Sequence, residues 1–477
     1  MTPFILAFLA WVMMALVVQV AVRVPVPGGA VVAISRTLLI EIWRRGVLPI
    51  CGGILFLGLA MLPWILDDSS EESSRLQTIL DYGQIWISSV LLLLSMWITS
   101  GSLADEIVTG RMRVLVVHRH GKSALLPGKW LGSVLAILAL LVPATAMLWM
   151  LSGQVVDRST DLFGEPAYEL VQPQIMEVSR EEVESYVALQ KLEDPAGWGA
   201  LDRDKAYRIA RSRIERLSHS LVQGVPMDYH FQYPGGLSEG AVLEFRPSLG
   251  RLHRSERARL RVQFDGTSKD VVIRNSVRSQ VEVPDRFRGD QEIVVTMEFL
   301  GAVSEEMRIP SMNWNGSDAL LLRIQEGSLL SSLIRSQLLL WIRCGFVAAL
   351  GLMVSTFLGL PVATLLVLCF FIAAAGGGFA GAFDENHEGS HSHPDPRDQE
   401  PSRVIIDLLA GGGEWIVGQL GDWNRHVTGS RVAAGENVKI AEVYSGFTRI
   451  GLIWAGLALL LGTWINSRKE HGLGVDR

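Results

Sequence analysis

Seven long apolar runs constrain this chain more than any other feature of its sequence. A helix needs about 20 consecutive apolar residues to cross a bilayer core, and each run reaches or approaches that length. Hydrophobic residues make up 49% of the 477 positions and charged residues only 19%, a balance typical of a polytopic membrane protein. The runs are Phe4–Val22, Gly46–Leu66, Trp86–Leu103, Leu131–Leu151, Leu338–Phe357, Pro361–Ala382 and Ile450–Ile465.

The charges between the runs predict their orientation, because short loops rich in Lys and Arg stay in the cytoplasm. The first interval, the third interval and the tail after the last run are basic, whereas Asp67–Asp81 carries five acids and one arginine. We therefore expect the N-terminus, 67–81, 152–327 and 383–449 to lie outside. The first run lacks a charged leader and a clear cleavage site, which favours a retained span over a signal peptide.

Arg343 interrupts the fifth run, and an unpaired charge at membrane depth costs several kcal/mol. Two interpretations remain open: the side chain snorkels towards the outer interface, or it belongs to a polar site or salt bridge inside the helix bundle. Arg335 is expected outside the apolar core.

The segment 152–327 reads as a water-facing α+β domain. The pattern over Ser179–Leu221 predicts two helices separated at Pro195 and Gly197, with a capping box at Ser179. A period of two then predicts an antiparallel sandwich or jelly roll, which suits binding or gating because its residues form no convergent catalytic set. The predicted strands are Met227–Tyr233, Ala241–Arg246, Arg259–Phe264, Val271–Asn275, Gln280–Val283 and Gln291–Leu300.

The segment 383–449 is expected to form a second outer insertion. It begins with an acidic, His-rich stretch typical of a weakly ordered loop. A metal site there is the alternative, although the spacing of its candidate ligands matches no closed site; these are Asp384, His387, His391 and His393. The apolar residues between Ile405 and Trp423 favour a pair of amphipathic helices on the outer membrane face or on the sandwich domain.

The interval 104–129 reads as a short, charged cytosolic hairpin. It contains Gly121-Lys122-Ser123, which resembles the end of a phosphate-binding loop, but Val116 stands where that motif requires glycine and Pro127 where its helix should begin. The spans lack Asp and Glu, and hydrolase and zinc motifs are absent. The sequence predicts no catalytic, cofactor or metal site on this chain and no nucleic-acid partner.

The order of these features resembles the membrane subunit of an ABC-2 type exporter, from a bacterial subgroup with a large extracytoplasmic insertion. An amphipathic helix (SRTLLIEIWRRGVL, from Ser35) precedes a span and an outer loop, and the next span ends in acids. A Gly-Lys pair then opens the following span. The resemblance places Asp105, Glu106, Gly110, Arg111, Gly128, Lys129 and Trp130 at the positions of that family's hairpin. The candidate ATPase-coupling residues are Asp105, Glu106, Gly110, Arg111, Arg113, Gly128 and Lys129.

The resemblance implies a six-span core with one extra N-terminal span, in a bacterial-type cytoplasmic (inner) membrane. It implies two protein partners besides the lipid bilayer. One is a separate ATP-binding cassette subunit at the membrane surface, and the other is a second permease copy in the bilayer, identical or related. Replacing Glu106 and Arg111 together by Ala is expected to weaken ATPase association. The alternative interpretation is that the charges of the hairpin only keep it in the cytoplasm.

An alternative function is a membrane-anchored extracytoplasmic binding or assembly protein without transport activity, in which the spans are only anchors.

The resulting division of the chain has six parts. They are 1–34, 35–151, 152–327, 328–382, 383–449 and 450–477.

Overall fold

A computed structural model describes most of the chain and divides it into two compact units. One unit comprises Met1–Glu165 with Ser328–Arg477 and is called the helical unit below; the other, Pro166–Gly327, is called the inserted unit. The described residues are 2–23, 29–65, 72–108, 121–155, 166–174, 180–198, 202–218, 220–249, 257–303, 311–314, 319–370, 423 and 426–468.

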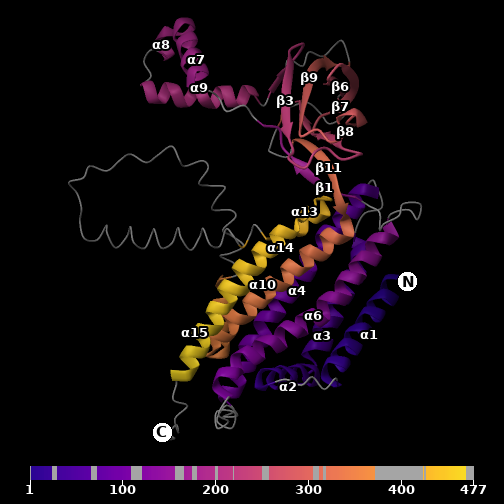
Figure 1. Cartoon of the computed structure of the whole chain (residues 1–477), viewed down its shortest axis with the longest axis vertical. Helices are drawn as coiled ribbons and strands as arrows, with labels where there is room; N and C mark the ends of the chain where they lie inside the picture. Colours follow the sequence, from indigo (N-terminus) through magenta and orange to yellow (C-terminus); the bar gives the residue numbers. More distant parts are fainter. Residues whose placement is uncertain are drawn as a thin grey trace, which may run out of the picture. The chain divides into compact units, whose positions relative to one another are not determined.

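The helical unit is a bundle of long helices (Figure 1). The last one is continuous across α14, the π-helical stretch η2 and α15, and spans Ile440–Arg468. The elements are α1 (Thr2–Arg23), α2 (Ala30–Arg44), α3 (Val47–Ile65), α4 (Glu72–Val108), α6 (Gly121–Val155), α10 (Leu329–Ser355), an unlabelled helix Leu360–Phe370, α13 (Gly429–Ala433), α14 (Ile440–Gly446), η2 (Phe447–Trp454) and α15 (Ala455–Arg468).

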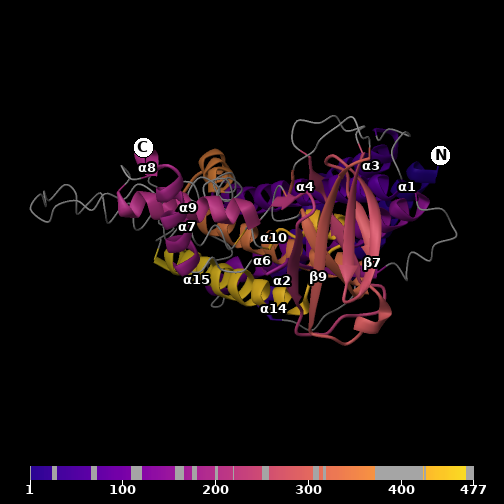
Figure 2. The same cartoon turned by 90° about the horizontal axis from the view of Figure 1, so that it is seen from above.

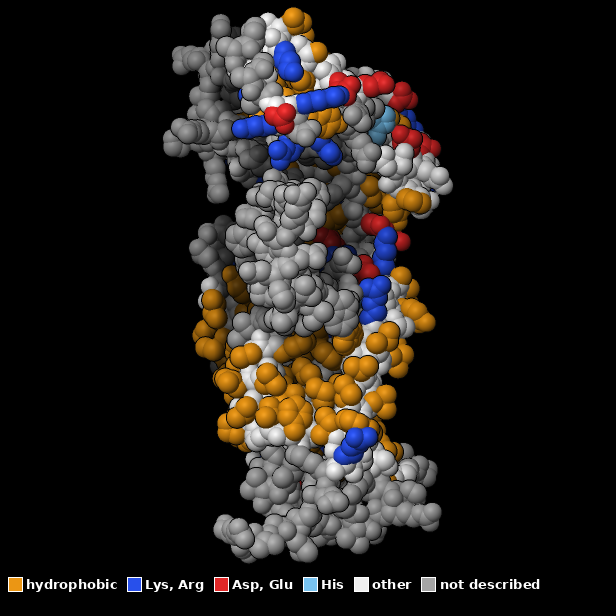
Figure 3. All heavy atoms as spheres, turned by 90° about the vertical axis from the view of Figure 1, so that its left-hand side faces the viewer, with side chains coloured by type: hydrophobic (Ala, Val, Ile, Leu, Met, Phe, Trp, Pro, Cys, Tyr) orange, Lys and Arg blue, Asp and Glu red, His pale blue; other side chains and the backbone are white. Residues whose placement is uncertain are grey.

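Six described helices are long and apolar enough to cross a membrane, which indicates a multi-pass membrane protein. They include six of the seven predicted runs. Of the remaining predicted span, Pro361–Ala382, the structure describes the part within the apolar helix Leu360–Phe370, and residues 371–382 lie outside the described residues. Figure 3 shows hydrophobic side chains gathered over one face of the bundle. Leu452, Leu460 and Trp464 of the last helix are among the exposed hydrophobic residues. Such a surface is suited to lipid tails.

Helix α10 is the central helix of this bundle. It contacts α4, α6 and α15, and most of its side chains are buried, whereas α1 and α15 expose much of their apolar surface. Helix α2 lies across one end of the bundle, against α6 (Figure 1). Gly46 follows α2 with φ of +76°, a left-handed conformation that favours glycine, and lets α3 begin at Val47.

The inserted unit combines a helical hairpin with antiparallel sheets, as the sequence predicts. A small core of Val183, Trp198, Ala206 and Ala210 joins its helices. The helices are α7 (Arg180–Glu193), α8 (Pro195–Trp198), α9 (Arg203–Ser218) and the 3-10 turn η1 (Asp285–Phe287). The strands are β1 (Pro166–Val171), β2 (Ser220–Val222), β3 (Pro226–Gln232), β4 (Val242–Phe245), β5 (Pro247–Ser248), β6 (Arg257–Phe264), β7 (Thr267–Arg274), β8 (Ser279–Glu282), β9 (Glu292–Ala302), β10 (Ser311–Trp314) and β11 (Leu320–Ser328).

The described strands form three sheets around one hydrophobic core. Their orders are β1-β11-β4-β8, β2-β10-β5 and β3-β9-β6-β7, and the long strands of the last sheet run side by side in Figure 2. In β9 the buried side chains alternate with accessible ones, which is the period of two that identified this strand in the sequence. Phe231, Phe245 and Phe299 bring three strands into the same core.

Several element boundaries differ from the sequence-based expectation. Helix α9 ends at Ser218 and Ser220–Val222 forms strand β2, so the predicted helix to Leu221 was too long. Residues 195–198 form a short helix where a break was expected. Five strands were not predicted: β1, β2, β5, β10 and β11. The proposed cap Ser179 lies outside the described residues.

Two differences affect the membrane part of the chain. The last span was expected from Ile450, but its helix begins at Ile440, inside the segment assigned to an outer insertion. Helix α2 begins at Ala30, before the expected boundary at Ser35. The extension of the last span contains polar residues such as Glu442, Ser445 and Arg449, which a hydropathy pattern leaves out of a span. The extension of α2 is apolar, so the boundary at Ser35 was simply placed too late.

Helix α6 also contradicts one expectation. Pro127 was expected to prevent a helix after Gly121, yet α6 begins at Gly121 and contains both Pro127 and Pro143. Prolines are tolerated in membrane helices because neighbouring groups compensate for the lost backbone hydrogen bond. Val116, which stands where the phosphate-binding motif requires glycine, therefore still excludes such a loop, whereas Pro127 does not.

Candidate functional site

A buried ion pair joins α4 and α6 at the two ends of the predicted hairpin. Lys129 Nζ lies 2.9 Å from Glu106 Oε2 and donates a hydrogen bond of 2.6 Å to the carbonyl oxygen of Ser102. The Lys129 side chain is only 2% exposed and that of Glu106 is 18% exposed. Lys129 is thus held inside the chain by one carboxylate and one helix carbonyl, both from α4.

Helix α2 rests on the same part of α6, against two glycines one turn apart. A Cβ atom at Gly128 would lie 2.9 Å from the carbonyl oxygen of Val31, and one at Gly132 would lie 2.8 Å from that of Ser35. Only glycine permits this approach of two helix backbones, as in small-xxx-small contacts of membrane helices. The start of α6 therefore fixes α2 on one face and α4 on another.

The structure brings together three of the predicted coupling residues: Glu106, Gly128 and Lys129. All three contact other helices of this chain, which is a role that the sequence did not predict for them. Asp105 belongs to α4, but its side chain is outside the described residues, as are Gly110, Arg111 and Arg113. Replacing Glu106 would remove the partner of Lys129, so the double change at Glu106 and Arg111 cannot separate docking from stability.

A second candidate region follows one stripe of α10. Its members are spaced by four and three residues, so they lie on one helix face. They are Ser332, Ser336, Leu339, Arg343 and Phe346. The segment from Trp423 to Asn437, which returns towards the last span, contacts this stripe, and we call it the returning segment.

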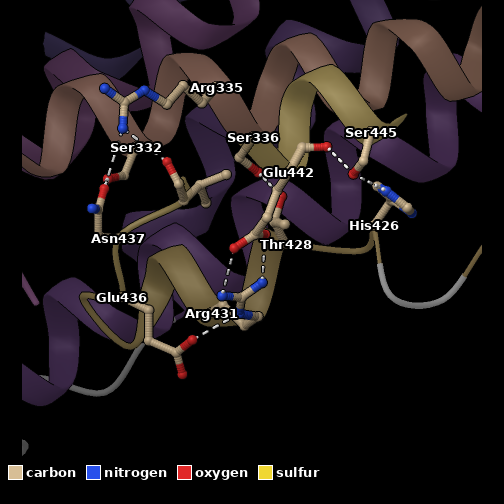
Figure 4. Close-up of polar contacts among 11 residues, drawn as sticks. Ser332, Arg335, Ser336, His426, Thr428, Arg431, Glu436, Asn437, Glu442 and Ser445 are labelled. Carbon is tan, nitrogen blue, oxygen red and sulfur yellow. Dashed lines mark hydrogen bonds and ion pairs between the residues drawn. The ribbon is translucent and has the colours of Figure 1, made fainter. Parts of the chain in front are cut away.

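Hydroxyl and amide groups attach the returning segment to α10 (Figure 4), and one of these links continues to α4. Thr428 donates to Ser336 Oγ at 2.7 Å, and Ser336 donates to Oε1 of Gln84 on α4 at 3.1 Å. Further along, Ser332 donates to Asn437 Oδ1 at 3.0 Å. These residues are buried, so the hydrogen bonds satisfy groups that would otherwise be costly at this depth.

Two arginines hold the end of the returning segment. Arg335 donates to the carbonyl oxygen of Val438 at 2.8 Å, which places its head group among polar partners. Arg431 pairs with Glu436 at 2.7 Å and with Glu442 at 2.9 Å (Figure 4). Partial burial opposes the charged form of Arg431, but the hydrogen bonds that its guanidinium donates to the two carboxylates outweigh this effect and raise its pKa.

Arg343 is the charged residue of this stripe, and it lies near the middle of α10. The helix begins at Leu329, about 20 Å away at 1.5 Å per residue, so Arg343 is deeper than its position in the predicted span indicated. Its guanidinium carbon lies 4.3 Å from the ring centroid of Trp423, and the residue is 7% exposed. This burial favours the interpretation of a polar site in the bundle over snorkelling.

The environment of Arg343 is aromatic. Phe346 contacts both Trp423 and Phe370, with ring centroids 5.8 and 6.0 Å apart. The Nε atom of Arg343 is buried without a hydrogen-bond partner, and no acid of the described chain pairs with its guanidinium. Stacking on Trp423 satisfies one face of the cation but none of its N–H donors.

Arg343 was recognisable from the sequence, but the other residues of its stripe were not predicted. Its predicted span began at Leu338, so Ser332 and Ser336 fell in a connecting segment, and Trp423 was assigned to an amphipathic surface helix. Their common helical spacing on an extended α10 would have been the available signal. Within the described residues no group of three potential ligands could hold a metal ion, and the His-rich stretch lies outside them.

Comparisons of the chain with protein families, with curated proteins and with solved structures found no match.

Proposed function

We propose that this chain is the membrane subunit of an ABC-2 type exporter, which couples ATP hydrolysis by a separate cytosolic subunit to movement of a substrate across the membrane. The observation that carries the proposal is the buried pair Glu106–Lys129, which joins α4 and α6 next to the segment 109–120. A connection fixed in this way transmits displacement to both helices together.

The packing of the bundle supports such a transmission path. Helices α4 and α6, which the segment 109–120 connects along the chain, both contact α10, and α2 contacts α6. A displacement of that connection would move packed helices as rigid elements, which is a common form of conformational coupling. In this proposal Arg111 and Arg113 contact the ATPase, while Glu106, Gly128 and Lys129 transmit the displacement.

We also propose a six-span ABC-2 core preceded by α1, in a bacterial-type inner membrane, with the inserted unit outside. The charges at the helix ends support this orientation. Arg44 ends α2 and Arg468 ends α15, and Figure 1 shows α2 and the C-terminal end of α15 at one end of the bundle, which supports a cytoplasmic face there by the positive-inside rule. The segment that connects α4 and α6 along the chain is also basic. A second permease copy completes the transporter in this proposal.

The test is association with an ATPase measured on the full chain. Arg111→Ala with Arg113→Ala is expected to reduce co-purification of a protein bearing a Walker ATP-binding sequence by about tenfold, since two charge-assisted contacts are lost. The vanadate-sensitive ATPase activity of the purified membrane complex should fall in parallel. The matched control is Arg203→Ala with Lys205→Ala, which removes the same charge from exposed positions of α9.

Equal recovery of the ATPase with both double variants would show that the hairpin is not the docking site. Absence of any ATPase with the unaltered chain would favour the alternative, a membrane-anchored binding or assembly protein. The observation that favours this alternative is the inserted unit, which is compact and has its own hydrophobic core.

A further inference from the structure

The guanidinium of Arg343 has an unusual combination of burial and missing partners. It lies at the middle of a candidate span, and a charge at that depth costs at least a few kcal/mol unless something compensates it. Two other arginines, Arg335 and Arg431, show how this bundle compensates a guanidinium charge. Arg335 contacts Asn437 and a backbone carbonyl, and Arg431 contacts two carboxylates.

Arg343 has neither kind of contact with the described residues. Its Nε is buried and unpartnered, and among the described residues its charged group stacks on the ring of Trp423. A planar guanidinium carries five N–H donors in its plane, and stacking leaves all of them available. The group is thus oriented by an aromatic ring, with its donor edge unsatisfied.

We propose that Arg343 binds an oxyanion, the carboxylate or phosphate group of a ligand, inside the helix bundle. Two parallel N–H···O bonds from the guanidinium would satisfy its donors and neutralise its charge, and such bidentate contacts are the strong ones for this side chain. Trp423 holds the plane of the guanidinium, and Phe346 and Phe370 make the surroundings apolar. These neighbours exclude water, which strengthens the ion pair.

The apolar surroundings also restrict the ligand. An aromatic wall beside the cation suits an anion that is attached to an apolar body, such as a phospholipid or a fatty acid, and the same guanidinium chemistry would accept a small free phosphate. If the chain is a transporter, this assigns an anionic substrate to it, and that extension rests on the function proposed above. Binding itself does not depend on an ATPase partner.

The experiment uses the full chain, purified in an uncharged maltoside detergent. Thermal unfolding is measured while dioleoyl phosphatidic acid is titrated in one arm and inorganic phosphate in the other. A ligand that binds the folded chain raises its Tm in a concentration-dependent way. Saturable stabilisation is expected in at least one arm, and the arm that responds identifies a lipid head group or a free anion as the source.

Four variants give the test its specificity. Arg343→Met should abolish the stabilisation, and Arg343→Lys should weaken it about tenfold because a lysine lacks the planar fork. Arg44→Met, which removes an exposed arginine of α2, should keep the stabilisation and so reports non-specific attraction of anions. Arg335→Met, at a partnered arginine, should lower the Tm but leave the anion-dependent increment.

The variant Arg343→Met also gives a readout without ligand. Removing an unpaired buried charge should leave the Tm of the anion-free chain unchanged or raise it. A decrease as large as that of Arg335→Met would show that the guanidinium is already satisfied within the chain, and would overturn the proposal. Stabilisation that is absent in both arms, or equal in the unaltered chain and in Arg343→Met, would overturn it as well. Loss of the ATPase partner with retained anion binding would contradict only the transport function.

Discussion

Lys129 illustrates how the role of a single residue depends on its partners. As a charged residue between a basic hairpin and an apolar run, it predicted a contact with another protein or a topological signal. Its side chain instead lies almost fully buried between Glu106 and the Ser102 carbonyl. A buried ammonium group is expensive alone, and removing either member of such a pair leaves the other uncompensated.

We therefore predict strong coupling between these two residues. Glu106→Gln and Lys129→Met should each lower the free energy of unfolding by roughly 3–5 kcal/mol, because each leaves one buried polar group unpaired. The double variant should lose far less than the sum of the two. Unfolding in mixed micelles with increasing SDS fraction measures all four proteins, and simple additivity would show that the pair does not couple α4 to α6.

Tyr229 gives the inserted unit a pH dependence on the alkaline side. Its burial raises the pKa to about 12, although the hydrogen bond that Trp314 donates to its oxygen acts in the opposite direction. An unfolded tyrosine has a pKa near 10, so the folded state retains the proton over this interval. The stabilisation is complete below about pH 10 and is lost as the pH rises towards 12.

The expected loss for this tyrosine is roughly 2–3 kcal/mol between these two pH values. Far-UV circular dichroism of the full chain during alkaline unfolding should show a weaker dependence for Tyr229→Phe, which cannot ionise. A slope identical to that of the unaltered chain would assign the alkaline transition to other groups. The variant is also expected to be less stable at neutral pH, because Trp314 Nε1 loses its acceptor.

At the scale of elements, the contact between α2 and α6 depends on two glycines. Gly128→Val and Gly132→Val should each destabilise this contact by about 1–3 kcal/mol, because the added carbon atoms would overlap the backbone of α2. Hydrogen exchange of the α2 amides should then increase. Gly53→Val in α3 is the matched control, since a Cβ at Gly53 has nothing within 4 Å. Similar exchange in all three variants would contradict the role of this contact.

The helices themselves were predictable to different extents. Apolar length located six described spans, but it placed the start of the last one at Ile450 and that of the fifth at Leu338, well inside the observed helices. The turns of α10 that precede Leu338 contain Ser332, Arg335 and Ser336. Their side chains form hydrogen bonds with Asn437, Val438 and Thr428, respectively. Hydropathy measures a residue alone, and these residues are compatible with the bundle only through their partners.

The molecule as a whole consists of a helical unit with six candidate membrane spans and an inserted unit. The inserted unit is compact and has a core of its own, which is why alternation in its strands could be read from the sequence. Its sheet order required the structure, because strands such as β10 and β11 pair with partners far away along the chain. Short strands like β5 carry too little pattern to be recognised.

The orientation of the two units in the membrane is directly testable. In a chain whose Cys51, Cys344 and Cys369 are replaced by Ala, Ser268→Cys in the inserted unit should react with a membrane-impermeant maleimide in intact spheroplasts. Ser467→Cys at the end of α15 should react only after permeabilisation. Both positions are exposed, so accessibility within the fold is matched. Reaction of Ser467→Cys in intact spheroplasts, with Ser268→Cys protected, would reverse the proposed topology.

The amino-acid sequence was enough to predict the multi-pass character of the chain, the approximate spans and the antiparallel strands of the insertion. These features depend on local composition and period, which a short window of residues contains. The contact of Glu106 with Lys129 became visible only in the folded chain, as did the stacking of Trp423 on Arg343, eighty positions apart. Such contacts depend on which helices lie side by side, and a one-dimensional pattern does not specify that arrangement.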